Sequence, residues 1–85
     1  EVQLFRSHHP GYADGEQLRD FVFVEDVAAA ILALLHRPGQ GLLNIGAGEA
    51  RTWLDLVRAV GAAMGVDPAI RFVDMPEALR PTYQY

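Results

Sequence analysis

Apolar positions in the first half of the chain predict a strand followed by a helix. Residues 21–24 read Phe-Val-Phe-Val, which is apolar on both faces and therefore predicts a short buried strand. Apolar side chains then recur at helical spacing over 27–35 and form one stripe on a predicted helix. Asp26 is placed to cap the start of this helix, and the Pro-Gly pair at 38–39 ends the pattern.

The second half of the chain predicts another strand and another helix. Residues 42–45 read Leu-Leu-Asn-Ile, which predicts a strand, and the Gly-Ala-Gly sequence at 46–48 predicts a tight turn. Thr52 and Asp55 then have the spacing of a capping box, with Asp in the place where Glu or Gln is usual. Gly65 is a natural end for the helix that follows.

The two ends of the chain complete the predicted order of elements. Residues 1–18 are polar and irregular, with turn signals at 9–11 and 14–15, and they predict a long loop. Residues 70–73 predict a last strand before a polar tail. The order loop-β-α-β-α-β predicts an α/β fold, and we expect one domain, or part of one, over residues 1–85.

Composition narrows the classes of partner. The chain is 51% hydrophobic and 21% charged, which is typical of a globular protein. Its net charge of -4 and its lack of a basic stripe argue against nucleic acid as the main partner. No apolar run approaches membrane-spanning length, so we expect no membrane partner. Cysteine is absent, which excludes disulfides and fits a cytoplasmic protein.

Few side chains in this sequence are suited to catalysis or metal binding. All seven basic residues are arginine, so a lysine base or Schiff base is excluded for the chain by itself. Ser7 is the only serine and lacks the sequence of a nucleophile elbow. His8 and His9 are adjacent in a predicted loop, and His36 lies near a predicted helix end. Because neither arrangement has metal-ligand spacing, we predict no metal site.

The Gly-Ala-Gly turn at 46–48 invites comparison with a dinucleotide-binding fingerprint. Arg51 stands where that fingerprint has its third glycine, and no acidic residue ends a second strand at the expected distance. The turn is better explained as a strand-to-helix connection. We therefore predict no cofactor-binding residues in this chain.

Arg19 and two late tyrosines each fit a structural and a binding interpretation. Arg19 precedes Asp20, and on spacing alone an exposed ion pair of little energetic value is favoured. The alternative is that Arg19 presents its donors to a phosphate or sugar oxygen. Tyr83 and Tyr85 either pack at the end of the chain or cover a polar ligand. The residues alone thus predict an α/β chain without a catalytic constellation.

Two longer stretches resemble a known family. Residues 19–31, RDFVFVEDVAAAI, resemble a signature of the extended short-chain dehydrogenases/reductases, which include the nucleotide-sugar epimerases and dehydratases. Residues 42–53, LLNIGAGEARTW, are similar to a second signature of that family, in the same order. The resemblance implies that the chain is the small C-terminal substrate-binding part of an extended Rossmann-type epimerase. The cofactor-binding Rossmann core would then be absent from this chain and belong to a longer parent protein.

The remaining segments resemble one branch of this family, the ADP-glyceromanno-heptose 6-epimerases. The similarity covers residues 4–22, LFRSHHPGYADGEQLRDFV, and residues 75–85, MPEALRPTYQY. It implies NADP as the cofactor and ADP-heptose as the nucleotide-diphosphate sugar, epimerised at C6 for lipopolysaccharide inner-core synthesis. The alternatives are a sister sugar 4-epimerase or 4,6-dehydratase, or a stand-alone binding or assembly module.

The resemblance also assigns roles to particular residues. Catalysis in this family uses a Tyr-x-x-x-Lys pair on the cofactor domain, whereas here Tyr12 is followed at that spacing by Glu16, so no catalytic residue is expected. Arg19 is expected at the substrate diphosphate, and Tyr83 is expected to touch the substrate. The parent is expected to be a homo-oligomer in which the missing cofactor domain is a partner of this part. The expected substrate-binding residues are Phe5, Arg6, Ser7, His8, Arg19 and Tyr83.

Overall fold

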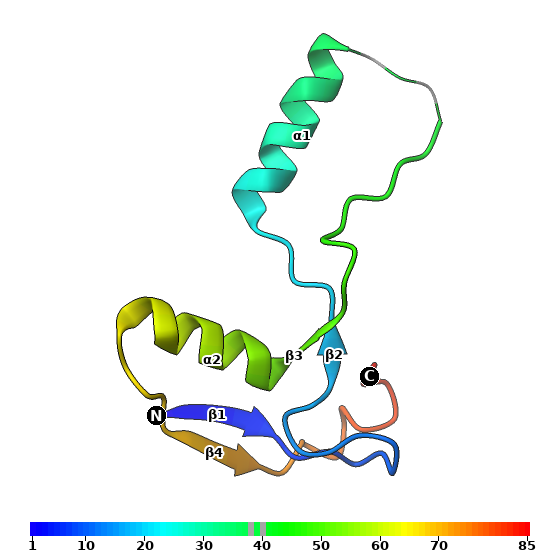
Figure 1. Ribbon diagram of the computed structural model, residues 1–85. Helices are drawn as coiled ribbons and strands as arrows, with labels where there is room; N and C mark the ends of the chain where they lie inside the picture. Colours follow the sequence, from blue (N-terminus) through cyan, green and yellow to red (C-terminus); the bar gives the residue numbers. More distant parts are fainter. Residues whose placement is uncertain (38, 40) are drawn as a thin grey trace. The chain divides into compact units, whose positions relative to one another are not determined.

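The computed structural model describes residues 1–37, 39 and 41–85, and these form two compact units. The first unit contains Glu1–Arg19 and Arg51–Tyr85, and the second contains Asp20–Ala50. A single domain over 1–85 stays a prediction. The elements in Figure 1 are, in chain order, β1 (Val2–Phe5), β2 (Leu18–Arg19), α1 (Val24–His36), β3 (Arg51–Thr52), α2 (Trp53–Met64) and β4 (Ile70–Val73).

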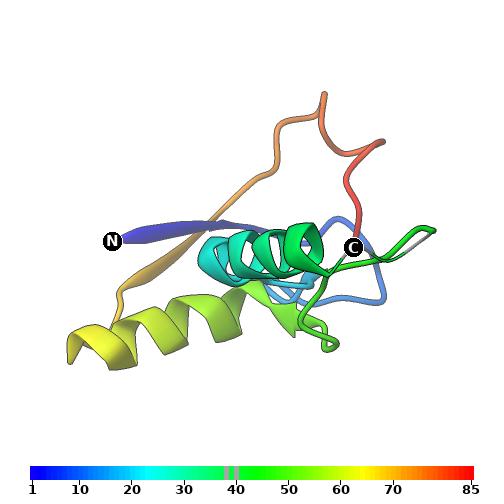
Figure 2. The same cartoon turned by 90° about the horizontal axis from the view of Figure 1, so that it is seen from above.

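The first unit is built on a pair of parallel strands, β1 and β4. Their register runs from Val2 opposite Ile70 to Phe5 opposite Val73. Helix α2 lies beside this pair in both views (Figures 1 and 2). The buried apolar side chains of the unit include Leu4. A helix beside parallel strands is the α/β arrangement that the order of elements predicts, and the expected strand at 70–73 is confirmed as β4.

Strand β1 lies inside the segment that was predicted to be a loop. Residues 2–5 read Val-Gln-Leu-Phe, a short alternation of apolar and polar side chains. The pattern is too brief to predict a strand without knowledge of its partner, because β4 is more than sixty residues away in the sequence. The loop prediction for residues 1–18 is therefore wrong at both of its ends, since Leu18 also begins β2.

Helix α2 begins and ends as the sequence predicts. The Thr52 hydroxyl accepts a hydrogen bond from the Asp55 amide at 3.0 Å, and the Asp55 carboxylate accepts from the Thr52 amide at 3.2 Å. Both bonds of a capping box are thus present. Gly65 follows the helix with a left-handed φ of 71°, which glycine adopts without steric cost.

The second unit contains α1, and here the predicted boundaries are wrong. Residues 21–23 form no strand, and Val24 already begins the helix. Phe23 is the N-cap in place of Asp26. Asp26 lies in the first turn, where its negative charge interacts favourably with the positive end of the helix dipole. The helix ends at His36. Pro38, which was predicted to stop it, lies outside the described residues.

The strand predicted over 42–45 is also absent from the described part of the chain. These residues have no partner strand, and Leu42 is fully exposed. Helix α1 buries none of its thirteen residues. The second unit therefore leaves Ile31, Leu34 and Leu35 of the apolar stripe exposed. Within the described ranges no helix combines the length and hydropathy that a membrane crossing requires.

Candidate functional site

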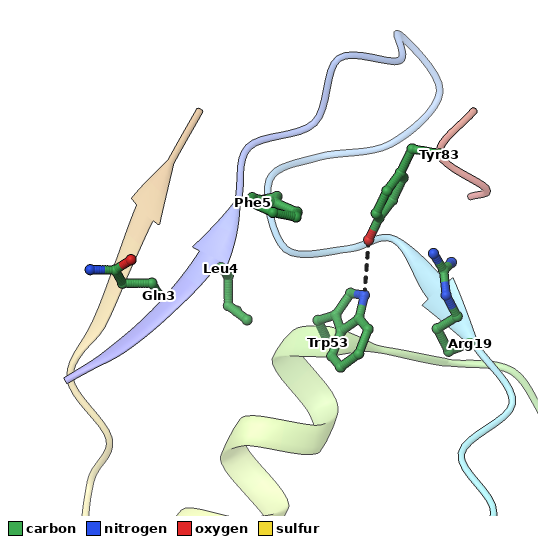
Figure 3. A pocket seen from close by; sticks show the side chains of 6 residues that line it. All are labelled: Gln3, Leu4, Phe5, Arg19, Trp53 and Tyr83. Carbon is green, nitrogen blue, oxygen red and sulfur yellow. Dashed lines mark hydrogen bonds between the residues drawn. The ribbon is translucent and has the colours of Figure 1, made fainter. Parts of the chain in front are cut away.

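A half-open pocket in the first unit brings together side chains from four separate segments (Figure 3). Its volume is about 270 Å³. Strand β1, strand β2, the first residue of α2 and the C-terminal tail each contribute to its lining. The lining residues are Gln3, Leu4, Phe5, Arg19, Trp53 and Tyr83.

The loop after β1 returns to the same strand and thereby places β2 beside the pocket. The Phe5 carbonyl accepts a hydrogen bond from the Gly15 amide at 3.3 Å and another from the Gln17 side-chain amide at 3.1 Å. Gln17 is almost completely buried. These bonds join the end of the loop, at Gly15 and Gln17, to Phe5 at its start. Arg19, two residues further on, therefore lies at the edge of the pocket.

The start of α2 is fixed to this loop by its own backbone. The Trp53 amide donates to the Gln17 carbonyl at 3.3 Å, and the Leu54 amide donates to the Gly15 carbonyl at 3.0 Å. With the Asp55 amide bonded to the Thr52 hydroxyl, these first-turn donors are already used. The helix start therefore serves to hold the Trp53 side chain in the pocket wall.

The capping box also has an electrostatic signature. Hydrogen bonds from the Thr52 amide and hydroxyl lower the pKa of Asp55 below its ordinary value of 3.8, and the charges of Arg51 and Arg58 act in the same direction. The carboxylate thus stays ionised, and it accepts the Thr52 amide bond in that form.

Arg19 and Tyr83 form the polar side of the pocket. The Arg19 guanidinium carbon lies 4.9 Å from the centroid of the Tyr83 ring, which is a cation–π arrangement. One guanidinium nitrogen, Nη1, donates to the Leu18 carbonyl at 2.6 Å. Among the described residues the Arg19 guanidinium forms no ion pair, so the exposed ion pair that spacing alone favoured is not found. Most donors of its fork remain available to a ligand.

A second arginine stands opposite Arg19 in the short sheet. Arg51 lies directly opposite Arg19 in the antiparallel pairing of β2 with β3. The floor of the pocket is apolar, with Leu4, Phe5 and the Trp53 indole. The pocket is therefore suited to a ligand that joins an anionic group to a flat or weakly polar one.

The Tyr83 side chain is held from several sides. Its hydroxyl accepts a hydrogen bond from the Trp53 indole N–H at 3.2 Å, which Figure 3 shows as a dashed line. Its ring makes an edge contact with Phe5, with 6.1 Å between centroids, and another with Tyr85 at 5.2 Å. These contacts fix the Tyr83 side chain in the pocket, although the tail that carries it is irregular.

Three residues expected at the substrate site, Arg6, Ser7 and His8, lie outside the pocket lining. Arg6 is exposed and forms an ion pair with Asp74, with 3.1 Å between Nη1 and Oδ1. The Ser7 amide donates to Asp14 Oδ1 at 2.8 Å, and the Ser7 hydroxyl donates to the His9 carbonyl at 3.0 Å. Arg6 and Ser7 thus make contacts within and beside the loop that follows β1.

His8 joins this loop to the tail. Its amide donates to the Tyr85 hydroxyl at 3.1 Å. The rings of His9, Tyr12 and Tyr85 lie 5.2 Å from one another in each pairing, so Tyr85 packs, as one of its two interpretations proposed. Of the six expected residues, the structure thus brings Phe5, Arg19 and Tyr83 into one pocket and leaves Arg6, Ser7 and His8 beside it.

Sequence reasoning did not anticipate Gln3, Leu4 or Trp53 in the pocket. Gln3 and Leu4 fall in the segment predicted to be a loop, where no face was assigned. Trp53 ends the second family signature, residues 42–53, and no role was predicted for it. A signal was present, however, because a partly buried tryptophan needs a partner for its indole N–H, and the late tyrosines offered one.

The Gly-Ala-Gly turn lacks the geometry of a dinucleotide fingerprint, and the absence of cofactor-binding residues stays a prediction. The Ala47 amide in the Gly-Ala-Gly turn already donates to Asp20 Oδ1 at 2.9 Å, and no helix begins at this turn. A phosphate cradle needs free amides at a helix start. In the same residues no three metal-ligating side chains come together, and the absence of a metal site stays a prediction.

Comparison with known proteins connects this geometry to a family. Residues 3–46 match the NAD dependent epimerase/dehydratase family. Two proteins named ADP-L-glycero-D-manno-heptose-6-epimerase, from Nitratidesulfovibrio vulgaris strains DP4 and Hildenborough, are 54% identical over 84 residues, which is 98% of this chain and 26% of theirs. A protein of the same name from Fusobacterium nucleatum is 40% identical over 91 aligned positions, covering 99% of this chain and 27% of its own. The chain thus spans about a quarter of the length of the curated relatives it matches.

Proposed function

Because this chain belongs to the NAD dependent epimerase/dehydratase family, we propose that it is the substrate-binding part of an ADP-heptose 6-epimerase. Support comes from the relatives of that name, which align with nearly the whole chain at 54% and 40% identity. Those alignments include all four segments that line the pocket. The alternatives, a sister 4-epimerase or 4,6-dehydratase, would share the family signatures and differ in the sugar bound.

The observation that carries the proposal is the pairing of Arg19 with Tyr83 at the rim of an apolar pocket. A sugar diphosphate would place its phosphate oxygens at the unused donors of Arg19, where charge-assisted hydrogen bonds are strongest. The Tyr83 ring and the Phe5 ring would cover the less polar faces of the ligand. In this arrangement the chain binds and orients the sugar.

Redox chemistry is assigned to other parts of the parent protein. We propose NADP as the cofactor, which accepts and returns a hydride when bound. We propose that the residues of this chain take no part in that transfer, and the lack of a helix start at the Gly-Ala-Gly turn supports this. A homo-oligomeric, cytoplasmic parent that acts in lipopolysaccharide inner-core synthesis completes the proposal.

The proposal is tested by titrating ADP-heptose into the NADP-saturated parent protein in a calorimeter. Arg19→Ala should weaken binding by about 1–3 kcal/mol, the usual range for losing a hydrogen bond to a charged group. Arg58→Ala removes the same charge from an exposed position of α2 outside the pocket and should leave the affinity unchanged.

Two outcomes would contradict the proposal at different levels. An unchanged dissociation constant in Arg19→Ala would remove this residue from the site. Preference of the wild-type parent for a UDP- or dTDP-linked sugar over ADP-heptose would favour a sister enzyme. Failure to bind any nucleotide-linked sugar would reject the substrate-binding role altogether.

A further inference from the structure

Tyr83 lines the pocket from a segment that has no regular secondary structure. The tail that carries it contains neither helix nor strand after β4. Immobilising a side chain on such a segment costs conformational entropy, so a residue that binds substrate from there needs an anchor. Ring contacts with Phe5 and Tyr85 limit the position of the Tyr83 ring, but they do not fix the direction of its hydroxyl.

Trp53 is the anchor that reaches the hydroxyl itself. Its indole N–H donates to the Tyr83 oxygen at 3.2 Å across thirty positions of sequence. The backbone of Trp53 is held in turn, because its amide donates to the Gln17 carbonyl and the capping box of Thr52 closes the turn that it begins. The tail tyrosine is therefore tied to the N-terminal end of α2, which the capping box and the Gln17 carbonyl hold in place.

This bond also determines which role the Tyr83 hydroxyl can play. A phenol has one O–H donor and accepts through its oxygen, whereas an indole nitrogen can only donate. Since Trp53 occupies an acceptor position, the O–H proton is left to point elsewhere. Among the described residues no acceptor for it is found. An acceptor-rich ligand in the pocket would receive this hydrogen bond, and the accepted N–H bond would strengthen it.

The same contact positions Arg19. The guanidinium lies over the Tyr83 ring at 4.9 Å, so a shift of that ring would move the electron-rich face on which the guanidinium rests. Figure 3 shows Trp53, Tyr83 and Arg19 on adjoining walls of the pocket. One indole bond thus orients both a neutral donor and a charged donor.

We propose that Trp53 is a positioning residue for diphosphate recognition, acting through Tyr83. The proposal rests on the proposed function of the pocket and adds a residue and a hydrogen-bond direction to it. The ligand class is a nucleoside diphosphate, whose phosphate oxygens accept from Tyr83 and Arg19 together.

A double-mutant cycle tests this role in the NADP-saturated parent protein, with ADP as the probe. Trp53→Phe keeps an aromatic ring and loses the N–H, and Tyr83→Phe loses the hydroxyl. Each single variant should weaken ADP binding roughly 2- to 10-fold, as expected for the loss of one hydrogen bond. The double variant should be no weaker than Tyr83→Phe alone, because Trp53 acts through that hydroxyl.

A purely structural role for Trp53 would give a different result. Its loss would then lower ADP affinity by the same factor whether or not the Tyr83 hydroxyl is present, and additive effects of this kind would overturn the proposal. Thr82→Val is the matched control, since its exposed hydroxyl donates only to the Leu79 carbonyl within the tail. It should leave ADP affinity within about twofold of wild type, the lower end of the range for a lost bond.

One further variant and two further binding results separate failure of the positioning role from failure of the proposed function. If Trp53→Phe does not fold, benzothienylalanine at position 53 preserves the bicyclic shape with sulfur in place of the N–H, and the same loss of coupling is expected. If wild-type protein binds ADP and Trp53→Phe binds it equally well, only the positioning role is rejected. If the wild type binds neither ADP nor any nucleotide-linked sugar, the proposed function itself is rejected.

Discussion

Replacing Gly15 with alanine probes the junction on which the pocket is built. Gly15 has a φ of 73° and lies between the loop after β1 and the start of α2. A Cβ atom added there would lie 2.9 Å from Leu54, 2.9 Å from Phe72 and 3.3 Å from Leu4. The substitution therefore introduces an unfavourable backbone conformation and a steric overlap at one site.

The two costs are estimated separately and then combined. A left-handed conformation at a residue with a Cβ costs about 1–2 kcal/mol. Overpacking by one methyl group in a well-filled region costs about 1–3 kcal/mol. Gly15→Ala should thus lower the free energy of unfolding by about 2–5 kcal/mol, a large fraction of the total stability of a small chain.

Urea unfolding of the 85-residue chain measures this loss. Trp53 is the only tryptophan in the sequence, so its fluorescence reports the unit in which Gly15 lies. Gly65→Ala is the matched control, because Gly65 has nearly the same φ of 71° and no atom within 4 Å of an added Cβ. It should lose only the conformational part, about 1 kcal/mol.

The difference between the two variants isolates the packing contribution. Equal losses in Gly15→Ala and Gly65→Ala would show that the contacts with Leu54 and Phe72 contribute nothing to stability. A loss below about 1 kcal/mol in Gly15→Ala would refute the reasoning entirely, since the backbone cost alone exceeds it.

Three further predictions concern the helices. Thr52→Ala should lower the free energy of unfolding by about 1 kcal/mol through loss of the cap, and a urea midpoint equal to that of wild type would contradict this. The pKa of Asp55 is lower in the folded chain than its ordinary 3.8, so its contribution to stability is present above that pH and is lost as the pH falls through 3.8 towards the lowered value. The stability difference between wild type and Asp55→Asn should therefore shrink between neutral pH and pH 3, and a constant difference would argue against the capping bond. Because Ile31, Leu34 and Leu35 of α1 are exposed, the isolated chain should self-associate or be marginally stable. A monomeric, high-melting chain in analytical ultracentrifugation and calorimetry would contradict that expectation.

Local signals in the sequence predicted local structure well. The capping box at Thr52, the left-handed Gly65 and strand β4 each depend on a few neighbouring residues, and all three are confirmed. The strands expected over 21–24 and 42–45 are wrong for a common reason. A strand needs a partner for its amides and carbonyls, and apolar composition alone does not say whether the chain supplies one.

The pocket was predictable only in part. Phe5, Arg19 and Tyr83 were identified through resemblance to a family, and the structure does bring them together. The role of Trp53 depends on a bond to a residue thirty positions away, which helical periodicity cannot indicate. Arg6, Ser7 and His8 are close to Phe5 in sequence, but the loop directs them to Asp74, Asp14 and the Tyr85 hydroxyl.

A crystal structure of the NADP-loaded parent protein with ADP-heptose bound would test the central claim most directly. We predict diphosphate oxygens within about 2.7–3.2 Å of both the Arg19 guanidinium and the Tyr83 hydroxyl, the range of a genuine hydrogen bond. The Trp53 indole should still donate to Tyr83 in that complex. A nucleotide sugar bound elsewhere, with Arg19 and Tyr83 facing solvent, would contradict the account.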